Sequence, residues 1–412
     1  MRVLFVVPNV PSFIRPRPFN FIRHLSEKHQ VSVVCLATND ADDRFISELR
    51  EHCQRLEVIR VTRWRSLANC LAALFTANSL RCAYFYSPRL RDSVKARVEA
   101  NEVDLVHAEH VKSLAMVDDV LGKVPAVFDA VDCLSMFESR RRRVTTNPLV
   151  KLFSWMESKK LAHLEAKAGH RFNRLAISSA IDREAYPVPA AMREKIDVVR
   201  NGVDLEHFRF RQFQVQENLL VFCAKLDYFP NQDAALYFAG SVWPVLRARR
   251  PELQLEIVGS RPPRSVRRLH GKNNIRVIGS VPDVRPYLGR AWVALCPIRI
   301  RAGIQFKLLE AMALGVPVVT TRLCCPGLGV EPGKHLLAAG DSSEFVSAVE
   351  LLLDNRRLRE ELIAAGRAYV EQEHDWTRLV AALSQSYQEA VADFSGSWPL
   401  EASRSQPRSL RT

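Results

Sequence analysis

The chain has 412 residues, of which 47% are hydrophobic and 25% are charged, so it is long enough for roughly two to three domains and too apolar to be disordered. Its apolar runs fall short of the roughly 20 residues that span a bilayer, and Val3 to Val7 is too short for a signal-peptide core, which predicts a cytoplasmic protein. The formal net charge is +14, and residues 1 to 200 hold 32 Lys and Arg against 23 Asp and Glu, which favours an anionic partner: nucleic acid, an anionic membrane surface or a phosphorylated small molecule.

Short apolar runs alternate with longer amphipathic segments, a pattern that predicts an α/β fold with parallel sheets. The chain opens with a strand at Arg2 to Pro8, a helix at Pro16 to Lys28 and a strand at Val31 to Ala37, which form one right-handed βαβ unit. Further strands are expected at Leu56 to Val61, Leu105 to His107, Ala126 to Asp129 and Leu175 to Ser178. These elements predict a first domain over residues 1–200.

The turn Asn201-Gly202-Val203-Asp204 and the polar stretch after it predict a domain boundary, so a second domain should span residues 201–375. Its strands are expected at Leu219 to Ala224, Leu253 to Val258, Ile275 to Ile278, Ala294 to Pro297 and Val316 to Thr320. Its helices are expected at Gln305 to Leu314, which Gly315 ends, at Glu344 to Asp354 and at Arg356 to Glu373. A last helix, residues 376–393, is expected to pack back on the first domain, and residues 395–412 have the composition of a disordered tail.

The segment from Arg299 to Thr321 carries the clearest signal for chemistry, because a loop, a helix and a strand follow one another there. Gly303 lets the backbone approach a ligand, and a helix that begins just after it points free N–H groups and a positive dipole end into a cleft, where they suit a diphosphate. Lys307 lies in the first turn, and Glu310 lies further along, where its carboxylate can bind a pair of ribose hydroxyls. The alternative is an ordinary amphipathic helix with a solvated Lys and Glu.

This segment resembles the signature of the family-four glycosyltransferases, retaining enzymes with the two-domain GT-B fold. Residues 196–208 resemble the interdomain turn of that family, Gly259 resembles its strand-ending glycine, and residues 277–284, which include Val281, are similar to the segment that receives the nucleotide base. The resemblance covers nearly all of residues 196–375 and is weaker across the first domain. It implies two Rossmann-like, doubly wound domains that face a central cleft, a UDP- or GDP-sugar as donor, and no permanently bound cofactor.

Residues 224–234 and 303–310 look closest to a branch of the family that is associated with bacterial exopolysaccharide assembly. In the wider family an arginine and a lysine after the first strand of the second domain bind the donor diphosphate. Lys225 matches the first of these, whereas Asn231 stands in the place of the second. The resemblance therefore leaves the phosphate charge to the helix dipole and to Lys225, Lys307 and either Arg299 or Arg301.

The family usually has two glutamates eight positions apart in the same segment. Glu310 matches the second, which the resemblance makes a ribose ligand, but Ala302 occupies the place of the first. Gly303 and Ile304 are then expected to present backbone N–H groups to the transferred sugar, and the neighbouring Gln305 is assigned to the same donor site.

Polar residues also follow the strands of the first domain, at the sheet edge where open α/β sheets bind ligands. His107, Glu109 and His110 are candidates there, and members of the family often carry a histidine at this place that contacts the donor sugar. We assign that role to His110, with Glu109 beside it, and a purely structural histidine is the alternative. Asn9 is expected to contact donor phosphate or acceptor. The same expectation covers Pro8, Ser12, Arg15 and Arg17, and Asp129 and Asp132 resemble an acceptor-side feature for which structural capping is the alternative.

Two segments mix basic and aromatic residues and are candidates for contact with an anionic bilayer that carries a lipid-linked acceptor. One is Arg140 to Arg143 followed by Leu149 to Leu161, and the other is Arg63 to Arg97. A solvated helix face is the alternative for both. Nucleic acid is not expected as a partner, because no helix-turn-helix or aromatic RNA-binding signature occurs.

No metal site is expected either. The nine cysteines include no C-x-x-C pair, and most lie in apolar segments, so they are interpreted as reduced core thiols. The D-x-D at Asp40 to Asp42 lies in a polar loop after the second strand, where chance explains it best.

The resemblance implies a metal-independent, retaining hexosyl- or related transferase whose acceptor hydroxyl belongs to a lipid-linked or oligosaccharide intermediate of bacterial surface polysaccharide synthesis. Such an enzyme is expected in the cytoplasm or at the inner face of the plasma membrane. Fixed cations and a helix N-terminus would stabilise the departing diphosphate. Two other classes remain open: a non-catalytic scaffold that binds nucleotide-sugar, and a sugar-nucleotide epimerase or hydrolase on the same fold.

Overall fold

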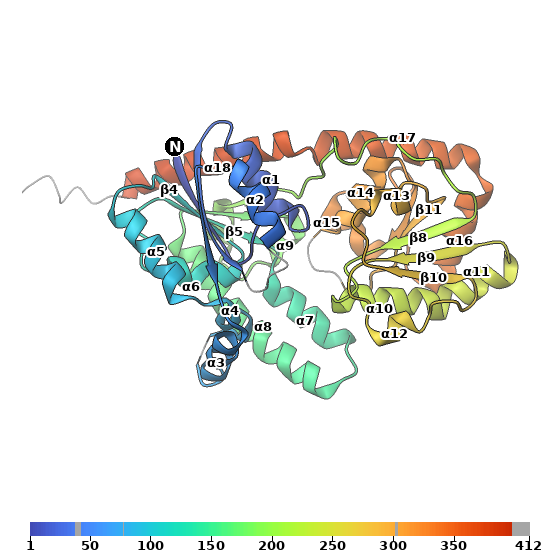
Figure 1. Ribbon diagram of the computed structural model, residues 1–412, viewed down its shortest axis with the longest axis horizontal. Coiled ribbons are helices and arrows are strands. Elements are labelled where there is room, and N and C mark those ends of the chain that lie inside the picture. Colours follow the sequence, from blue (N-terminus) through green and yellow to red (C-terminus); the bar gives the residue numbers. More distant parts are fainter. Residues whose placement is uncertain (38–42, 77, 301–303, 398–412) are drawn as a thin grey trace, which may run out of the picture.

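Runs of buried apolar residues form the centre of each half of the molecule. In the first strand, β1 (Arg2–Val7), every residue after Arg2 is buried, and all of β8 (Leu219–Cys223) is buried. Strands that are buried on both faces are typical of parallel sheets covered by helices. The computed structural model, which describes residues 1–37, 43–76, 78–300 and 304–397, has two such parallel sheets (Figure 1).

The first sheet has seven strands in the order β3-β2-β1-β4-β5-β6-β7. Besides β1, its strands are β2 (Gln30–Ala37), β3 (Arg55–Arg60), β4 (Leu105–Glu109), β5 (Ala126–Val131), β6 (Arg174–Ile177) and β7 (Ile196–Val198). The order reverses direction between β1 and β4, which is the place where doubly wound sheets open a crevice for ligands. The carboxyl ends of β1, β4 and β5 meet at this crevice.

The second sheet has six strands in the order β10-β9-β8-β11-β12-β13, so it repeats the winding of the first. Besides β8, its strands are β9 (Gln254–Val258), β10 (Ile275–Gly279), β11 (Val293–Cys296), β12 (Val318–Thr321) and β13 (Leu337–Ala339). The predicted α/β class with two Rossmann-like parallel sheets is therefore confirmed. All the predicted strands are present with ends within two residues of those expected, and only the three-residue strands β7 and β13 were not predicted.

Helices cover both faces of each sheet (Figure 1). Those of the first half are α1 (Pro16–Leu25), α2 (Asp43–Glu51), α3 (Arg63–Ala73), α4 (Leu80–Phe85), α5 (Pro88–Glu99), α6 (Leu114–Val117), α7 (Leu134–Val144), α8 (Pro148–Arg171) and α9 (Ala180–Ala185). The second half adds α10 (Phe229–Tyr237), α11 (Trp243–Arg249), α12 (Arg264–Arg267), α13 (Arg285–Leu288), α14 (Phe306–Leu314), α15 (Cys325–Leu328), α16 (Ser342–Asp354) and α17 (Arg356–Glu373). Across the described residues, no helix is both long and apolar enough to cross a bilayer.

The last helix, α18 (Trp376–Ser397), returns to the first sheet and packs against α1, β5 and β6 (Figure 1). Its Tyr387 lies in the same apolar cluster as Phe5, and the Tyr387 hydroxyl is hydrogen-bonded to His107 Nδ1 at 2.9 Å. The helix continues through residues 395–397, where the sequence predicted the start of a disordered tail, and residues 398–412 lie outside the described part of the chain.

Two chain segments connect the halves, and they are packed against each other. Val203 N–H donates to the carbonyl of His374 at 2.9 Å, and a ring nitrogen of His374 is 2.7 Å from the carbonyl of Asn201. Gly202 lies directly beneath Trp376, since a Cβ atom placed on it would be 2.6 Å from the indole ring. A side chain at position 202 would therefore push the two connections apart.

A buried ion pair anchors the first connection to the first sheet. The Arg17 guanidinium, on α1, donates to both carboxylate oxygens of Asp129 on β5, at 2.7 and 2.9 Å, and both side chains are at most 3% exposed. The remaining nitrogen of the same guanidinium donates to the Val199 carbonyl at 2.8 Å and to Asn201 Oδ1 at 2.9 Å. One cation thus joins α1, the sheet and the interdomain connection.

Loss of this cation should destabilise the protein strongly, because Asp129 would remain buried without a partner. Arg17→Met is expected to cost about 3–5 kcal/mol and to lower the melting temperature by roughly 10 °C in differential scanning calorimetry. Arg17→Met/Asp129→Leu should recover part of the loss, since it leaves no buried charge. Arg2→Met is the matched control, because the Arg2–Asp104 pair is 43% and 39% exposed, and a comparable fall in that control would contradict the assignment.

Candidate active site

Helix α14 lies at the carboxyl edge of the second sheet, between β11 and β12. It begins at Phe306, with Gln305 as the residue before its first turn, and it ends at Gly315, whose φ of 76° is the left-handed conformation that favours glycine. The sequence predicted this helix and its terminating glycine correctly. Arg301, Ala302 and Gly303, which the sequence assigned to the loop before it, lie outside the described residues.

The Lys307 ammonium group is held in place by two side-chain amides. Its Nζ donates to Asn231 Oδ1 at 3.0 Å and to Gln305 Oε1 at 2.9 Å. Asn231 is itself buried, and its Nδ2 donates to the Lys225 carbonyl at 2.8 Å. Asn231 therefore orients one predicted cation and braces the turn that carries the other.

The predicted cations differ in how they are paired. Arg299 forms a bidentate pair with Asp233, at 2.9 and 2.6 Å, and its guanidinium lies 4.6 Å from the centre of the Tyr237 ring. The hydrogen bond to Asp233 also raises the pKa of Arg299. Neither Lys225 nor Lys307 has a carboxylate within ion-pair distance in the part of the chain that is described. These two lysines, rather than Arg299, have positive charge to offer a ligand.

Glu310 lies one turn after Lys307 and on the same side of α14, because residues three apart on a helix are neighbours. Its side chain is half-buried, and burial raises its pKa to about 7, an effect that the positive charge of Lys307 partly opposes. Among the described residues the carboxylate has no hydrogen-bond donor. It is therefore available to accept hydrogen bonds from a ligand.

Gly259 and Val281 shape the neighbouring loops. Gly259 has a φ of 155°, and a Cβ atom on it would lie 1.6 Å from the carbonyl oxygen of Ala224, so only glycine fits between β9 and the turn that bears Lys225. Val281 follows β10, is half-buried and packs against the apolar core. Ile304 is buried just before α14. The described second-domain residues that the sequence assigned to the donor site therefore lie at one edge of the second sheet, whereas Asn9 follows β1 of the first sheet.

His110 ends β4 of the first sheet in a strained conformation. Its φ of 66° is uncommon for a residue other than glycine, and its N–H donates to the Asp129 carbonyl at 2.7 Å. Val131 at the end of the adjacent β5 has a φ of 64°, which is still less favourable for a β-branched residue. Strained residues are concentrated at functional sites, and these two lie side by side at the predicted crevice.

The pKa values of the ionisable residues at this edge are shifted in the direction that favours their uncharged forms. Burial lowers the pKa of His110 well below its usual value, so the imidazole is neutral at pH 7. Burial and the nearby Asp129 raise the pKa of Glu109 to about 7, while burial lowers the pKa of Lys112 to about 8. The Lys112 ammonium lies 4.3 Å from the centre of the Phe85 ring. Asn9, at the end of β1, lies at the same edge and is partly exposed.

Five first-domain residues that the sequence placed near substrate are buried in the interior instead: Pro8, Ser12, Arg17, His107 and Asp129. Arg17 and Asp129 form the buried pair described above, and neither is free to bind a ligand. His107 is fully buried, with its ring stacked on Phe5 at 4.3 Å, and burial lowers its pKa to about 4. The last three of these five residues position the edge that carries Glu109 and His110.

One contact across the interdomain space was not predicted. Phe137 on α7 stacks on Tyr228 before α10, with ring centres 6.3 Å apart, and Arg141 lies 5.6 Å from the centre of the Phe229 ring. Tyr228 and Phe229 belong to the same turn as Lys225, so the contact sets the distance between α7 and the donor-site turn. The adjacent Tyr228 and Phe229 can be seen in the sequence, but their contacts with Phe137 and Arg141 on α7 cannot.

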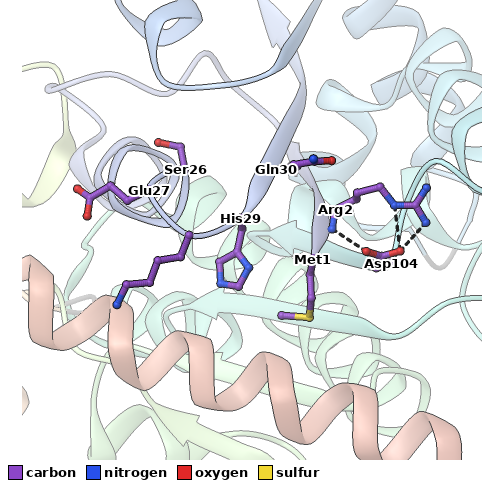
Figure 2. Close-up of a pocket in the computed structure, with 8 residues that line it drawn as sticks. Met1, Arg2, Ser26, Glu27, His29, Gln30 and Asp104 are labelled. Atoms are coloured by element: carbon purple, nitrogen blue, oxygen red, sulfur yellow. Dashed lines mark hydrogen bonds and ion pairs between the residues drawn. The ribbon is translucent and has the colours of Figure 1, made fainter.

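A surface hollow of about 490 Å³ lies at the opposite, amino edge of the first sheet (Figure 2). It is lined by Met1, Arg2, Ser26, Glu27, Lys28, His29, Gln30 and Asp104. Arg2 and Asp104 bind each other there, and none of the predicted site residues contributes to it. Across the described residues, no group of three or more His, Cys, Asp or Glu side chains is arranged to hold a metal ion.

The second half of the chain is similar to proteins of a known family. Residues 217–355 match the sequence model of the family described as "Glycosyl transferases group 1". The second domain is therefore similar in sequence to group 1 glycosyltransferases. The matched range includes the described residues of the second domain that the sequence assigned to a donor site: Lys225, Asn231, Gly259, Val281, Arg299, Ile304, Gln305, Lys307 and Glu310.

Two curated relatives are mannosyltransferases. Phosphatidyl-myo-inositol mannosyltransferase from Mycobacterium leprae is 33% identical over 144 residues, which cover 33% of this chain and 38% of that protein. The GDP-mannose-dependent monoacylated alpha-(1-6)-phosphatidylinositol monomannoside mannosyltransferase from Corynebacterium glutamicum is 34% identical over 145 residues, which cover 32% of this chain and 38% of the relative. The chain thus aligns with little more than a third of the length of these relatives.

The solved structures extend the likeness to both domains. The Anabaena protein Alr3699/HepE in complex with UDP-glucose superposes with a TM-score of 0.66 at 15% identity, and the match covers 94% of this chain and 99% of that chain. At this identity the match shows a shared fold. The two sheets of this chain therefore have the arrangement of a GT-B fold, of which the second domain is one half.

Replacing Glu310 with Gln tests whether its carboxylate lacks a partner. A carboxyl group whose pKa rises from 4.5 to about 7 on folding binds more protons in the folded chain between these values, so the folded state loses stability as pH rises through them. Between pH 5 and pH 8 the free energy of unfolding of Glu310→Gln should therefore rise, relative to that of the wild type, by up to about 3 kcal/mol. Thermal unfolding at both pH values measures the difference, and Glu361→Gln, at an exposed position, should follow the wild type. If the stability of Glu310→Gln changed with pH in the same way as that of the wild type, a cationic partner would be holding the Glu310 carboxylate ionised.

Proposed function

We propose that the protein is a retaining glycosyltransferase that moves a hexosyl or related residue from a nucleotide-diphosphate sugar to an acceptor hydroxyl. The observation that carries the proposal is that Lys307 and Glu310 lie on the same side of α14 without binding each other, inside the segment that matches the group 1 model. The ammonium group suits the diphosphate, and the unpartnered carboxylate suits the two ribose hydroxyls.

In the proposed complex the donor lies along the carboxyl edge of the second sheet. Lys225, Lys307 and the free N–H groups at the start of α14 face the diphosphate, and Val281 lies near the base. Because Asn231 and Gln305 already hold the Lys307 ammonium, this charge needs little reorganisation when negative charge grows on the departing diphosphate. Preorganised charge of this kind lowers the barrier to bond breaking, and we propose that it removes the need for a metal ion.

The proposed reaction retains the configuration of the sugar through front-face attack. The bond from the anomeric carbon to the diphosphate oxygen breaks, the acceptor oxygen bonds to the same face, and its proton passes to the departing phosphate oxygen. His110, neutral at pH 7, can hydrogen-bond to a sugar hydroxyl, and Glu109 lies beside it. Water excluded by closure of the two domains would otherwise hydrolyse the donor.

Support for the donor and acceptor differs in strength. The Corynebacterium relative is GDP-mannose-dependent by its name, whereas the Anabaena protein, which shares the fold alone, holds UDP-glucose. We therefore propose GDP-mannose as the first donor to test and UDP-glucose as the second. Both curated relatives are named for phosphatidylinositol-based acceptors, which supports a lipid-linked acceptor. We place the reaction in bacterial surface polysaccharide synthesis, in the cytoplasm at the inner face of the plasma membrane.

A thermal-shift panel of GDP, UDP, ADP and their sugar conjugates tests the donor site. A ligand at 100 times its dissociation constant stabilises the folded state by about 2.7 kcal/mol, so one nucleotide family should raise the melting temperature of the wild type by several degrees. Lys307→Ala and Glu310→Ala should abolish the shift at the same concentration. Lys272→Ala, an exposed lysine of the same domain, should keep it. If no nucleotide shifts the wild type near millimolar concentration, the proposal fails.

The stereochemistry and the role of His110 are tested with the donor so identified. The anomeric proton of the first-formed product, followed by NMR, should show the configuration of the donor, and an inverted product would contradict the proposed attack. His110→Ala should lower kcat at least tenfold while the donor dissociation constant changes little, since the side chain acts on the sugar. His163→Ala on α8 is the control. Release of free sugar at full rate without any acceptor would instead indicate a hydrolase.

A further inference from the structure

Helix α3 carries an apolar stripe on its solvent side, the reverse of the usual arrangement for a surface helix. Trp64, Leu67, Leu71, Leu74 and Phe75 follow one another at helical spacing, and Trp64 and Phe75 are 83% and 90% exposed. The side chains that α3 buries are the small Ser66 and Ala73. Water is a poor solvent for such a stripe, so a partner surface is expected to cover it.

The turn between α7 and α8 carries a second exposed apolar group. Val144, Leu149, Leu152 and Trp155 are all exposed there, with Leu149 at 76%. Both groups lie at the lower edge of the first domain in Figure 1, where α3 and the ends of α7 and α8 project from the body of the molecule. We call the two groups together the α3/α8 face.

Buried contacts hold the two parts of the α3/α8 face in one rigid unit. Glu157 on α8 is fully buried and accepts hydrogen bonds from Ser79 Oγ at 2.6 Å and from Leu80 N–H at 2.9 Å, at the start of α4. Lys160 Nζ, also on α8, donates to the Ala73 carbonyl at the end of α3 at 3.0 Å. The stripe on α3 therefore keeps its position relative to the apolar residues of α8.

The charge around the α3/α8 face has one sign. Residues 61–91 contain no Asp or Glu, and in residues 139–164 the one acidic residue is the buried Glu157. The exposed basic side chains of the face are Arg63, Arg65, Arg142, Arg143, Lys151 and Lys159. A stripe with Trp and Phe, bordered by Lys and Arg and lacking exposed acids, has the chemistry of a surface that inserts into the headgroup region of an anionic bilayer.

We propose that the α3/α8 face docks this protein on a bilayer that contains anionic phospholipid. This docking rests on the proposed function, which supplies a lipid-linked acceptor. It adds that the acceptor lies in the bilayer on which the protein docks. Helix α7 connects the two places, because it begins just after β5 ends at the crevice and finishes at the exposed Val144. Its 11 residues span about 16 Å, so a lipid-borne acceptor with an extended headgroup reaches from the bilayer to the crevice.

Flotation of the full chain with vesicles tests the proposal. Wild-type protein should float with phosphatidylcholine vesicles that contain 30 mol% phosphatidylglycerol, and it should stay in solution with pure phosphatidylcholine. Trp64→Ser/Phe75→Ser and Arg142→Ser/Arg143→Ser should each lower the partition coefficient roughly tenfold or more. Arg142 and Arg143 are chosen because Arg141 contacts Glu138 and the Phe229 ring. Leu351→Ser and Arg267→Ser/Arg268→Ser, at exposed positions of the second domain, are the matched controls.

Two further measurements separate the possible failures. The α3/α8 face variants should keep the nucleotide-induced thermal shift of the wild type, which would show that they are folded. The thermal shift also tests the proposed function independently of the result with vesicles. The docking proposal would be overturned if the wild type did not bind anionic vesicles, or if the α3/α8 face variants bound them as tightly as the wild type. A third outcome would also overturn it: the wild type is a dimer in sedimentation velocity, and Trp64→Ser/Phe75→Ser abolishes the dimer without changing flotation. A second copy of the chain would then cover the α3/α8 face.

Discussion

The pairing of Arg17 with Asp129 is the interaction on which the rest of the structure depends. A buried ion pair yields little net stability unless every remaining donor and acceptor is satisfied, and here the guanidinium also bonds to Val199 and Asn201 of the interdomain connection. The Asp129 carbonyl in turn accepts from the His110 N–H. One charged group therefore sets the position of the edge of the first sheet that carries Glu109 and His110 and the point at which the chain leaves for the second domain.

In the proposed donor site a neutral side chain stands at the place where the resemblance to the family implies a second cation. Asn231 adds no charge, but it holds the Lys307 ammonium and the Lys225 carbonyl at once. Fixing the direction of one cation can offset the absence of another, because an ammonium that is free to rotate must lose that freedom when it meets a phosphate. Arg299, by contrast, is neutralised by Asp233, and a guanidinium paired in this way contributes little to binding an anion.

Most of the fold could be predicted because its strands form continuous apolar runs and because helices such as α1, α16 and α17 are amphipathic with a 3.6-residue period. The exceptions, β7 and β13, have three residues each, too few for any period to appear. For the site, Lys225 was assigned from the resemblance and Glu310 from its place in the helix together with the resemblance, whereas Glu109 and His110 were assigned by the rule that the carboxyl ends of parallel strands gather at one edge. This rule could not distinguish them from Arg17, Asp129 and His107, because the pairing of residues 112 positions apart is a property of packing and leaves no local pattern.

The return of α18 to the first sheet has a consequence for how the chain is made. The cluster that contains Phe5 is completed by Trp376, Leu383 and Tyr387, so the first domain to leave the ribosome is the last to close its core. The second domain, whose sheet lies wholly within residues 219–339, can fold while α18 is still inside the exit tunnel. During that interval the face of the first sheet that α18 will cover is open to solvent, and exposed apolar surface of this kind makes a nascent chain prone to aggregate.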